Sequence, residues 1–239
     1  MSIFDQKVIK YEMKPLSSLE KVFPDETPVY RMECQMLSGL WGETVSFQVA
    51  YTGDFVMRER LDVRVVSELA EHVHVRTVEM VPVGRATNGI VDDNYLKTTS
   101  GLYPDLLKDL KDGKVIVYSR QWRSLWVDVD ITNEIPAGEY EIELQLIKEG
   151  EVVCSAKQKV TVIGTELPKL DIMHTEWMHA DCLADYYHVE VFSEEHWKLL
   201  ENYFQEYVKR DCNMMLTPLF TSPLDTAIGL ERTTCQLID

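Results

Sequence analysis

The sequence lacks the features that would place the protein in a membrane or outside the cell. No apolar run approaches the ~18 residues of a membrane-spanning helix. The amino terminus shows neither a long apolar segment nor a small-residue cleavage site, so we recognise no secretory signal. The five cysteines are an odd, widely spaced set without a C-x-x-C pair, which favours reduced thiols over a disulfide framework. We therefore expect a cytoplasmic protein.

Basic residues are also scarce. Lysine and arginine total 24 against 40 aspartates and glutamates, which leaves a formal net charge of −16. Nucleic acid and anionic membrane surfaces would repel such a chain, so we expect neither as a partner. The simplest interpretation of the charge is that it keeps the protein soluble.

Most of the first two thirds of the chain alternates apolar and polar residues, the pattern of half-buried strands. The segments that show it are 45–51, 61–65, 73–76, 115–118, 122–131, 140–146 and 152–162. Lys148–Glu151 is a short hairpin loop between the last two. Short strands with turns between them and no helical period predict an antiparallel β-sandwich over residues ~30 to 163.

Two segments around these strands show no clear period. Residues 1–28 form a turn-rich lead-in, and residues 86–113 form a long insertion in which Leu102–Leu107 is predicted to lie against the neighbouring domain. His72 and His74 share a strand face by parity, a spacing that two metal ligands can use, but solvent-facing polar residues explain them better.

The pattern changes after the turn-prone connector 164–168. A short strand is predicted at Leu170–Met173, a long excursion at 174–192, a helix that starts after Ser193, and a second, buried strand at Met214–Thr217. Phe192 and Trp197 are spaced as a hydrophobic staple for that helix, which also carries apolar residues at helical spacing. The sequence therefore predicts two domains, a sandwich over 1–164 and, over 165–239, about one right-handed βαβ unit of a (β/α) barrel.

The second domain carries a resemblance to a known family. The run His174–Tyr187, with Asn213–Pro218 and Pro223–Ala227, resembles the opening of the DUF4091-type barrel domain in bacterial proteins related to family 123 of the glycoside hydrolases, which contains N-acetyl-β-galactosaminidases. Upstream, 101–107, 122–129 and 136–140 resemble the β-sandwich that precedes this barrel. The resemblance implies a carbohydrate partner and no cofactor.

The site of a (β/α) barrel lies in the loops after its strands. The expected loops 174–188 and 217–225 therefore share one rim. Trp177 is suited to stack on a sugar ring, and polar groups beside it to bind hydroxyls. The predicted substrate-binding residues are His174, Trp177, His179, Asp181, Thr217 and Asp225.

Other interpretations of the same stretch remain open. Trp177, Tyr186 and Tyr187 would pack between the two domains if the stretch were structural. A metal-dependent hydrolase would need His174, His179 and Asp181 to converge, but their spacing fits no HExxH helix and no zinc knuckle. Nucleophilic Cys-His-Asp chemistry is weaker still, because closeness in sequence does not place such residues together in a fold.

The family resemblance implies retaining hydrolysis in which the substrate's own 2-acetamido group attacks the anomeric carbon. An adjacent Asp-Glu pair on a later barrel strand orients that amide and protonates the leaving oxygen. The only Asp-Glu dipeptide of this chain is Asp25-Glu26, in the lead-in, so no catalytic residue is assigned here.

A full barrel takes about 250 residues, but only residues 165–239 follow the predicted sandwich, so we expect a truncated chain. The uncovered barrel edge and the apolar faces of Trp197, Leu200 and Phe204 then predict homo-oligomers. The rival hypothesis is a non-catalytic carbohydrate-binding or structural module, whose surface aromatics would be Tyr103, Trp122 and Trp126.

Overall fold

A computed structural model describes residues 10–28, 36–55, 58–85, 95–169 and 171–216. The chain divides between Leu167 and Pro168 into two units, which are taken one at a time below.

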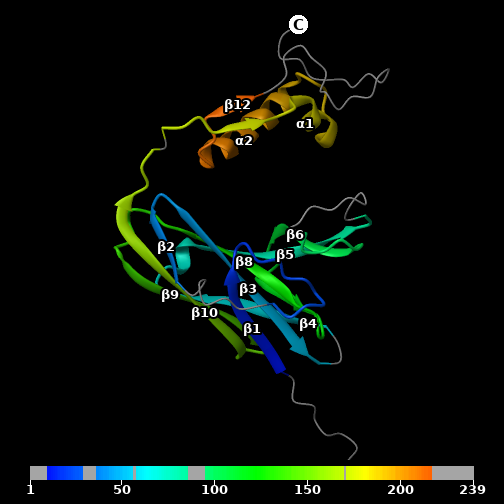
Figure 1. Cartoon of the computed structure of the whole chain (residues 1–239), viewed down its shortest axis with the longest axis vertical. Coiled ribbons are helices and arrows are strands. Elements are labelled where there is room, and N and C mark those ends of the chain that lie inside the picture. Colours follow the sequence, from blue (N-terminus) through cyan, green and yellow to red (C-terminus); the bar gives the residue numbers. More distant parts are fainter. Residues whose placement is uncertain (1–9, 29–35, 56–57, 86–94, 170, 217–239) are drawn as a thin grey trace, which may run out of the picture. The chain divides into compact units, whose positions relative to one another are not determined.

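The N-terminal unit consists of two five-stranded sheets that face each other (Figure 1). The first has the order β1-β3-β8-β5-β6, with bounds Lys10–Ser17, Thr44–Asp54, Arg123–Asp130, Val73–Val83 and Gly101–Asp109. The second has the order β2-β10-β9-β4-β7, with bounds Met36–Trp41, Glu151–Glu166, Gly138–Lys148, Glu59–Val66 and Lys114–Val117. The predicted sandwich is confirmed.

The alternating residues explain why these sheets stack. In β8, Leu125, Val127 and Val129 are completely buried, and their neighbours in sequence point to the other face. In β9, Ile142, Leu144 and Leu146 are buried in the same cluster. Fully burying one such side chain contributes about 1.5–3 kcal/mol, so the space between the sheets holds most of the stability of this unit.

The Glu149-Gly150 turn between β9 and β10 confirms the predicted hairpin. Both residues have positive φ, +52° and +89°, as the two-residue turns that match strand twist require. A departure from an antiparallel sandwich lies at an edge, where β2 runs parallel to β10.

Three strands of the sandwich were not predicted. The insertion expected over 86–113 contains one of them, and whether Leu102–Leu107 lies against the neighbouring domain stays a prediction. Leu102–Leu107 belongs to β6, which pairs antiparallel with β5. Its alternation is hidden because Leu102 and Leu106 are exposed while Pro104 is buried. The lead-in contains β1, and β2 precedes the first strand that the sequence indicated. A short 3₁₀ turn at Ala70–His72 keeps His72 off the strand that carries His74.

The C-terminal unit is a β-α-α-β segment. Strand β11 (Thr175–Trp177) lies parallel to β12 (Met214–Leu216), and between them come α1 (Ala180–Tyr187) and α2 (Glu194–Lys209). The strand predicted at Leu170–Met173 is therefore misplaced, and the predicted excursion contains a helix. The reason is physical: β12 begins opposite Thr175, and a short strand is fixed by its partner more than by its own residues.

Helix α2 begins where the sequence indicated. The Ser193 side chain accepts a hydrogen bond from His196 N at 3.2 Å, and the Phe192 and Trp197 rings stack with centroids 5.9 Å apart. This confirms both the N-cap and the staple. Among the described residues no helix is long and apolar enough to cross a membrane.

Helix α2 carries two neighbouring apolar stripes. One contains His196 and Leu200, which are buried, and Leu200 forms a cluster with Met178, Ala180 of α1 and Met215 of β12. The other contains Trp197, Phe204 and Val208, which are exposed and line a shallow hollow of ≈ 540 Å³. The prediction of an uncovered face is thus correct for Trp197 and Phe204 but wrong for Leu200. Self-association through this face stays a prediction.

Candidate functional site

The candidate site is the carboxyl end of β11 and the first turn of α1. Trp177 is the last residue of β11 and is 70% exposed. Directly after it, Met178 N donates to Leu216 O at 2.9 Å, which fixes the chain as it leaves the strand. His179 is the N-cap of α1, and Asp181 is buried in its first turn. An exposed indole and two polar residues therefore follow one another at one strand end.

His179 is the least satisfied of these side chains. Its Nδ1 atom is buried and makes no hydrogen bond with the residues that the structure describes. Its side chain does not cap α1 either. A buried ring nitrogen without a partner is costly unless something else supplies one, so His179 has capacity to bind a further group.

His174 lies at the other end of β11. Its backbone N donates to Asn213 Oδ1 at 3.0 Å, and its carbonyl accepts from Met214 N at 3.1 Å. Its Nε2 lies 3.3 Å from Glu176 Oε1. Because the strand begins after His174, this residue precedes β11 instead of following a strand as expected. Its role in substrate binding stays a prediction.

The remaining predicted site residues, Thr217 and Asp225, lie outside the described residues. No group of three or more His, Cys, Asp or Glu side chains that could hold a metal occurs in the described part of the chain. The metal-dependent alternative therefore has no supporting geometry there. Among the described cysteines, Cys154 and Cys212 are free thiols.

His196 is a residue of this unit that sequence reasoning missed. It is completely buried, its Nε2 lies 2.8 Å from Ala180 O, and its Nδ1 accepts from Phe192 N at 3.0 Å. These contacts fix the neutral tautomer that carries the proton on Nε2. The ring therefore ties the start of α1 to the loop that enters α2, and so holds the segment that presents Trp177 and His179. The spacing of His196 with Leu200 and Tyr207 was the signal available in the sequence.

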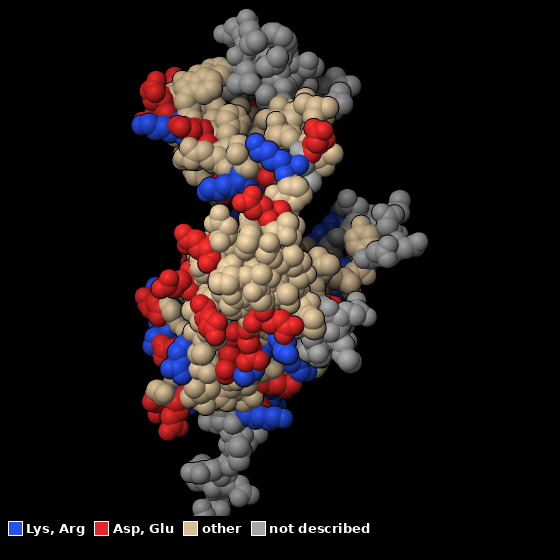
Figure 2. All heavy atoms as spheres, turned by 90° about the vertical axis from the view of Figure 1, so that its left-hand side faces the viewer, with Lys and Arg blue, Asp and Glu red and all other residues tan. Residues whose placement is uncertain are grey.

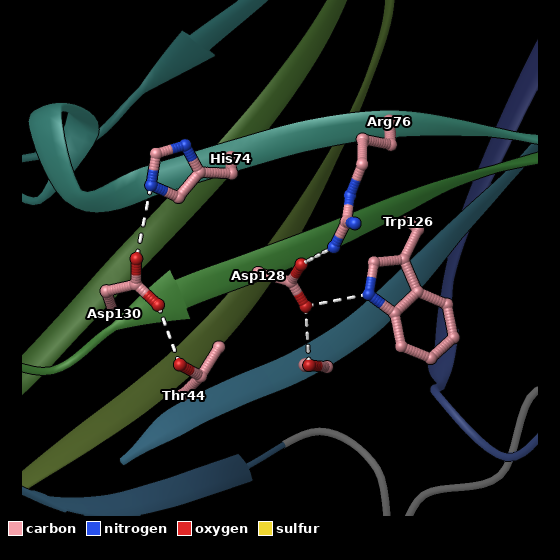
Figure 3. Close-up of polar contacts among 7 residues, drawn as sticks. Thr44, His74, Arg76, Trp126, Asp128 and Asp130 are labelled. Carbon is pink, nitrogen blue, oxygen red and sulfur yellow. Dashed lines mark hydrogen bonds and ion pairs between the residues drawn. The ribbon is translucent and has the colours of Figure 1, made fainter. Parts of the chain in front are cut away.

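The sandwich carries a second polar cluster, on the outer face of its first sheet (Figure 3). Asp128 of β8 accepts from Ser46 Oγ at 2.6 Å, from Trp126 Nε1 at 2.7 Å and from Arg76 Nη2. In the same row, Asp130 accepts from Thr44 Oγ1 at 2.7 Å and lies 3.1 Å from His74 Nε2. Donors thus come from three adjacent strands, and every donor is a protein group. The cluster joins the three strands, and within it only the buried Nε atom of Arg76 has no hydrogen-bond partner among the described residues.

The aromatics of the rival binding module do not form an exposed platform. Trp122 is buried, Trp126 is partly buried and bonded to Asp128, and Tyr103 packs edge-on against Phe23 with centroids 5.6 Å apart. A sugar-binding face needs flat rings open to solvent. These three residues therefore give the rival hypothesis no support.

Charge on the sandwich follows the composition. On the face in Figure 2, acidic side chains gather to the left of and below an uncharged area. The single Asp-Glu dipeptide is part of the protein surface: Lys97 Nζ lies 2.9 Å from Asp25 and 2.8 Å from Glu26. The hydrogen bond from Lys97 lowers the pKa of Asp25. Asp25 and Glu26 thus form solvated ion pairs with Lys97, and a lowered pKa is the opposite of what a general acid needs.

The comparisons with known proteins point to one family. The family "Glycoside hydrolase 123, catalytic domain" matches residues 177–239. A family 123 glycoside hydrolase from Clostridium perfringens has a similar structure, with a TM-score of 0.63 and 13% sequence identity over 88% of this chain and 38% of that chain. The resemblance to family 123 is thereby confirmed, and the matched segment is similar to part of that family's catalytic domain.

The other likenesses are weaker. A β-glucosidase from Listeria innocua has a TM-score of 0.30 and 10% identity over 67% of this chain and 17% of that chain. A DUF4466 family protein from Parabacteroides merdae has a TM-score of 0.33 and 9% identity over 65% of this chain and 45% of that chain. No curated protein sequence matches the chain significantly.

Proposed function

We propose that this chain is part of a glycoside hydrolase of the family 123 type and that it contributes walls of the substrate cleft. The observation that carries the proposal is that two likenesses agree. The family catalytic domain matches residues 177–239, and the fold of the Clostridium perfringens enzyme matches 88% of this chain, which is more than the N-terminal unit alone contains. A likeness of the sandwich alone would say little, because one fold hosts many functions.

The proposed substrates are N-acetyl-hexosaminides, including those on glycolipids, since the Clostridium perfringens enzyme was studied for glycolipid glycan hydrolysis. Hydrolysis would be retaining and assisted by the substrate's 2-acetamido group. The chain spans 38% of the length of that enzyme and contains no Asp-Glu pair after residue 164. We therefore give its residues binding roles and no catalytic role.

Within the chain, Trp177 would stack on the apolar face of a sugar ring and His179 would bind a hydroxyl. The exposed indole and the unpartnered Nδ1 atom support these roles. Asp181, buried in the first turn of α1, would orient the same region.

The test uses the complete reading frame that contains this chain, assayed on an aryl N-acetyl-β-galactosaminide. We expect cleavage, and we expect Trp177→Ala to lower kcat/KM about tenfold through loss of the stacked face. Tyr186→Ala is the matched control, because Tyr186 is a similarly exposed aromatic residue on the adjacent helix. If the complete product cleaves no N-acetyl-hexosaminide, the proposal fails. An equal loss of kcat/KM in both variants would show that Trp177 has no specific role in substrate binding.

A further inference from the structure

A cavity of ≈ 560 Å³ opens between β6 and β7, the edge strands at one side of the sandwich. It is lined by six cationic side chains and three carboxylates. The cations are Arg58, Arg60, Lys108, Lys111, Lys114 and Arg123, and the carboxylates are Glu59, Glu79 and Asp109. An excess of positive charge here is unexpected in a chain with a net charge of −16.

One of the three carboxylates is already satisfied away from these cations. Glu59 accepts hydrogen bonds from Lys148 Nζ at 2.9 Å and from the Tyr11 hydroxyl. Burial opposes ionisation of Glu59, but these two hydrogen bonds and the charge of Lys148 hold its pKa below the usual value. Its negative charge is therefore shared with Lys148, which does not line the cavity.

Two of the cations are also paired. Arg60 lies 2.9 Å from Asp112 and Lys114 lies 3.1 Å from Asp62. The other four, Arg58, Lys108, Lys111 and Arg123, form no ion pair with any residue that the structure describes. Glu79 and Asp109 are the carboxylates left to face them, so the cavity keeps a positive surplus.

Arg123 is the deepest of these cations. It stands opposite Tyr51 in the register of β8 and β3, and Tyr51 belongs to the core between the sheets. Because paired residues project to the same face, Arg123 enters the space between the sheets. Its guanidinium carbon lies 4.9 Å from the centre of the Tyr118 ring, and Nη2 donates to Gln121 Oε1 at 3.1 Å.

The Nε atom of Arg123 is buried and has no hydrogen-bond partner among the described residues. A buried cationic donor without an acceptor is costly, and such an atom in a cavity wall calls for a ligand or water. The neighbouring Tyr51 stays protonated, because burial raises its pKa, and its hydroxyl makes only a long contact of 3.5 Å to Ile116 O. Two donors therefore lack a good acceptor at the same place.

We propose that this cavity binds a small oxyanion, a carboxylate or sulfate group carried on a ligand of about monosaccharide size. The planar guanidinium of Arg123 can donate paired hydrogen bonds to the oxygens of such a group. Arg58 and Lys108 add positive charge that attracts the anionic ligand. The volume lies within the range of small-molecule sites. The site is independent of the proposed hydrolysis, because it lies in the sandwich, outside the residues that match the catalytic domain.

The test is isothermal titration of the 239-residue protein with glucuronate, with inorganic sulfate and with glucose, at constant ionic strength set by chloride. We expect saturable binding of both anions and none of glucose. Arg123→Gln is expected to weaken binding about tenfold or more, and Arg58→Gln to weaken it a few-fold.

Arg64→Gln is the matched control. It removes the same charge from the sandwich, but Arg64 is bonded to Gln145 and does not line the cavity. Its affinity is expected to equal that of the unmodified protein. Binding of glucuronate without sulfate would support the site and assign it to carboxylates. Binding of both would support a general oxyanion site.

Two results would overturn the proposal. One is that neither glucuronate nor sulfate binds saturably. The other is an equal loss of affinity in Arg64→Gln and Arg58→Gln, since screening of the whole protein would then explain the binding. If circular dichroism shows that Arg123→Gln is unfolded, the exposed Arg58 carries the test, and unchanged affinity in Arg58→Gln overturns the proposal.

Discussion

The two units of this protein hold their elements together in different ways. In the described part of the sandwich, twenty buried residues form one cluster between the sheets. The cluster in the described part of the C-terminal unit has three, Met178, Ala180 and Leu200. The C-terminal unit adds a buried, doubly bonded His196. The sandwich is therefore stabilised mainly by buried apolar area, whereas the segment beside the candidate site is stabilised by a few specific contacts.

The largest expected effect separates these two modes of stabilisation. Leu144→Ala should lower the free energy of unfolding of the sandwich by about 3 kcal/mol, because it leaves a cavity among fully buried side chains. Leu200→Ala should abolish amide-exchange protection in α2 and leave the sandwich unchanged. Hydrogen exchange followed by mass spectrometry reports both. If Leu200→Ala also lowers the exchange protection of the β8 and β9 amides, the two units unfold cooperatively.

Much of this contrast could be predicted from the sequence. Strands such as β8 and β9 alternate cleanly because one face is buried against a second sheet, and the turn at Glu149-Gly150 has its own local signal. Strand β6 was not predicted because its exposed leucines conceal the alternation. The strand at β11 was misplaced because its position is set by pairing with β12.

The candidate site was less predictable for a physical reason. Residue types suggested that His174, Trp177, His179 and Asp181 act together, but strand boundaries decide which end each residue occupies. A shift of β11 by a few residues leaves Trp177 and His179 at its carboxyl end and His174 before its start. The clamp by His196 depends on backbone groups of Ala180 and Phe192, which no residue pattern reveals.

The second prediction concerns that clamp. His196→Phe keeps a ring of similar shape but leaves Phe192 N and Ala180 O without their partner, so we expect a loss of about 2 kcal/mol in the C-terminal unit. The measurement is amide exchange in α1 and α2. His188→Asn is the control, since His188 is exposed in a left-handed conformation that asparagine tolerates. Equal protection in both variants would show that the clamp contributes nothing.

The third prediction tests whether the sandwich also depends on polar contacts. Asp128→Asn keeps the shape of the side chain but removes the charge that faces Arg76. Arg76 is partly exposed, so water compensates in part, and we expect a loss of about 1–2 kcal/mol. Thermal or denaturant unfolding measures it, with Asp130→Asn as the more exposed neighbour in the same row. A loss as large as that of Leu144→Ala would mean that polar contacts stabilise the sandwich as strongly as apolar burial does.

The smallest effect is a pH dependence in the C-terminal unit. The Tyr187 and Tyr203 hydroxyls lie 3.1 Å apart, and this hydrogen bond, with a lesser contribution from burial, raises the pKa of Tyr203. A group whose pKa is higher in the folded state stabilises fully below its unfolded pKa, about 10 for tyrosine, and loses that contribution as pH rises through the folded value. The stabilisation by the pair should therefore be present at neutral pH and disappear in alkali.

A double comparison isolates this effect. Tyr203→Phe should lower the stability of α2 slightly at about pH 8, by well under about 1 kcal/mol because the pair is largely exposed, and the difference from the unmodified protein should shrink above about pH 10. Tyrosinate absorbance should also lose a component whose pKa lies above the usual tyrosine value. Tyr186→Phe, whose hydroxyl makes no hydrogen bond with the described residues, should do neither. If Tyr203→Phe and the unmodified protein were equally stable across this pH range, packing of the Tyr203 ring, which phenylalanine keeps, and not its hydroxyl would join α1 to α2. The C-terminal unit would then resemble the sandwich more closely than its small core suggests.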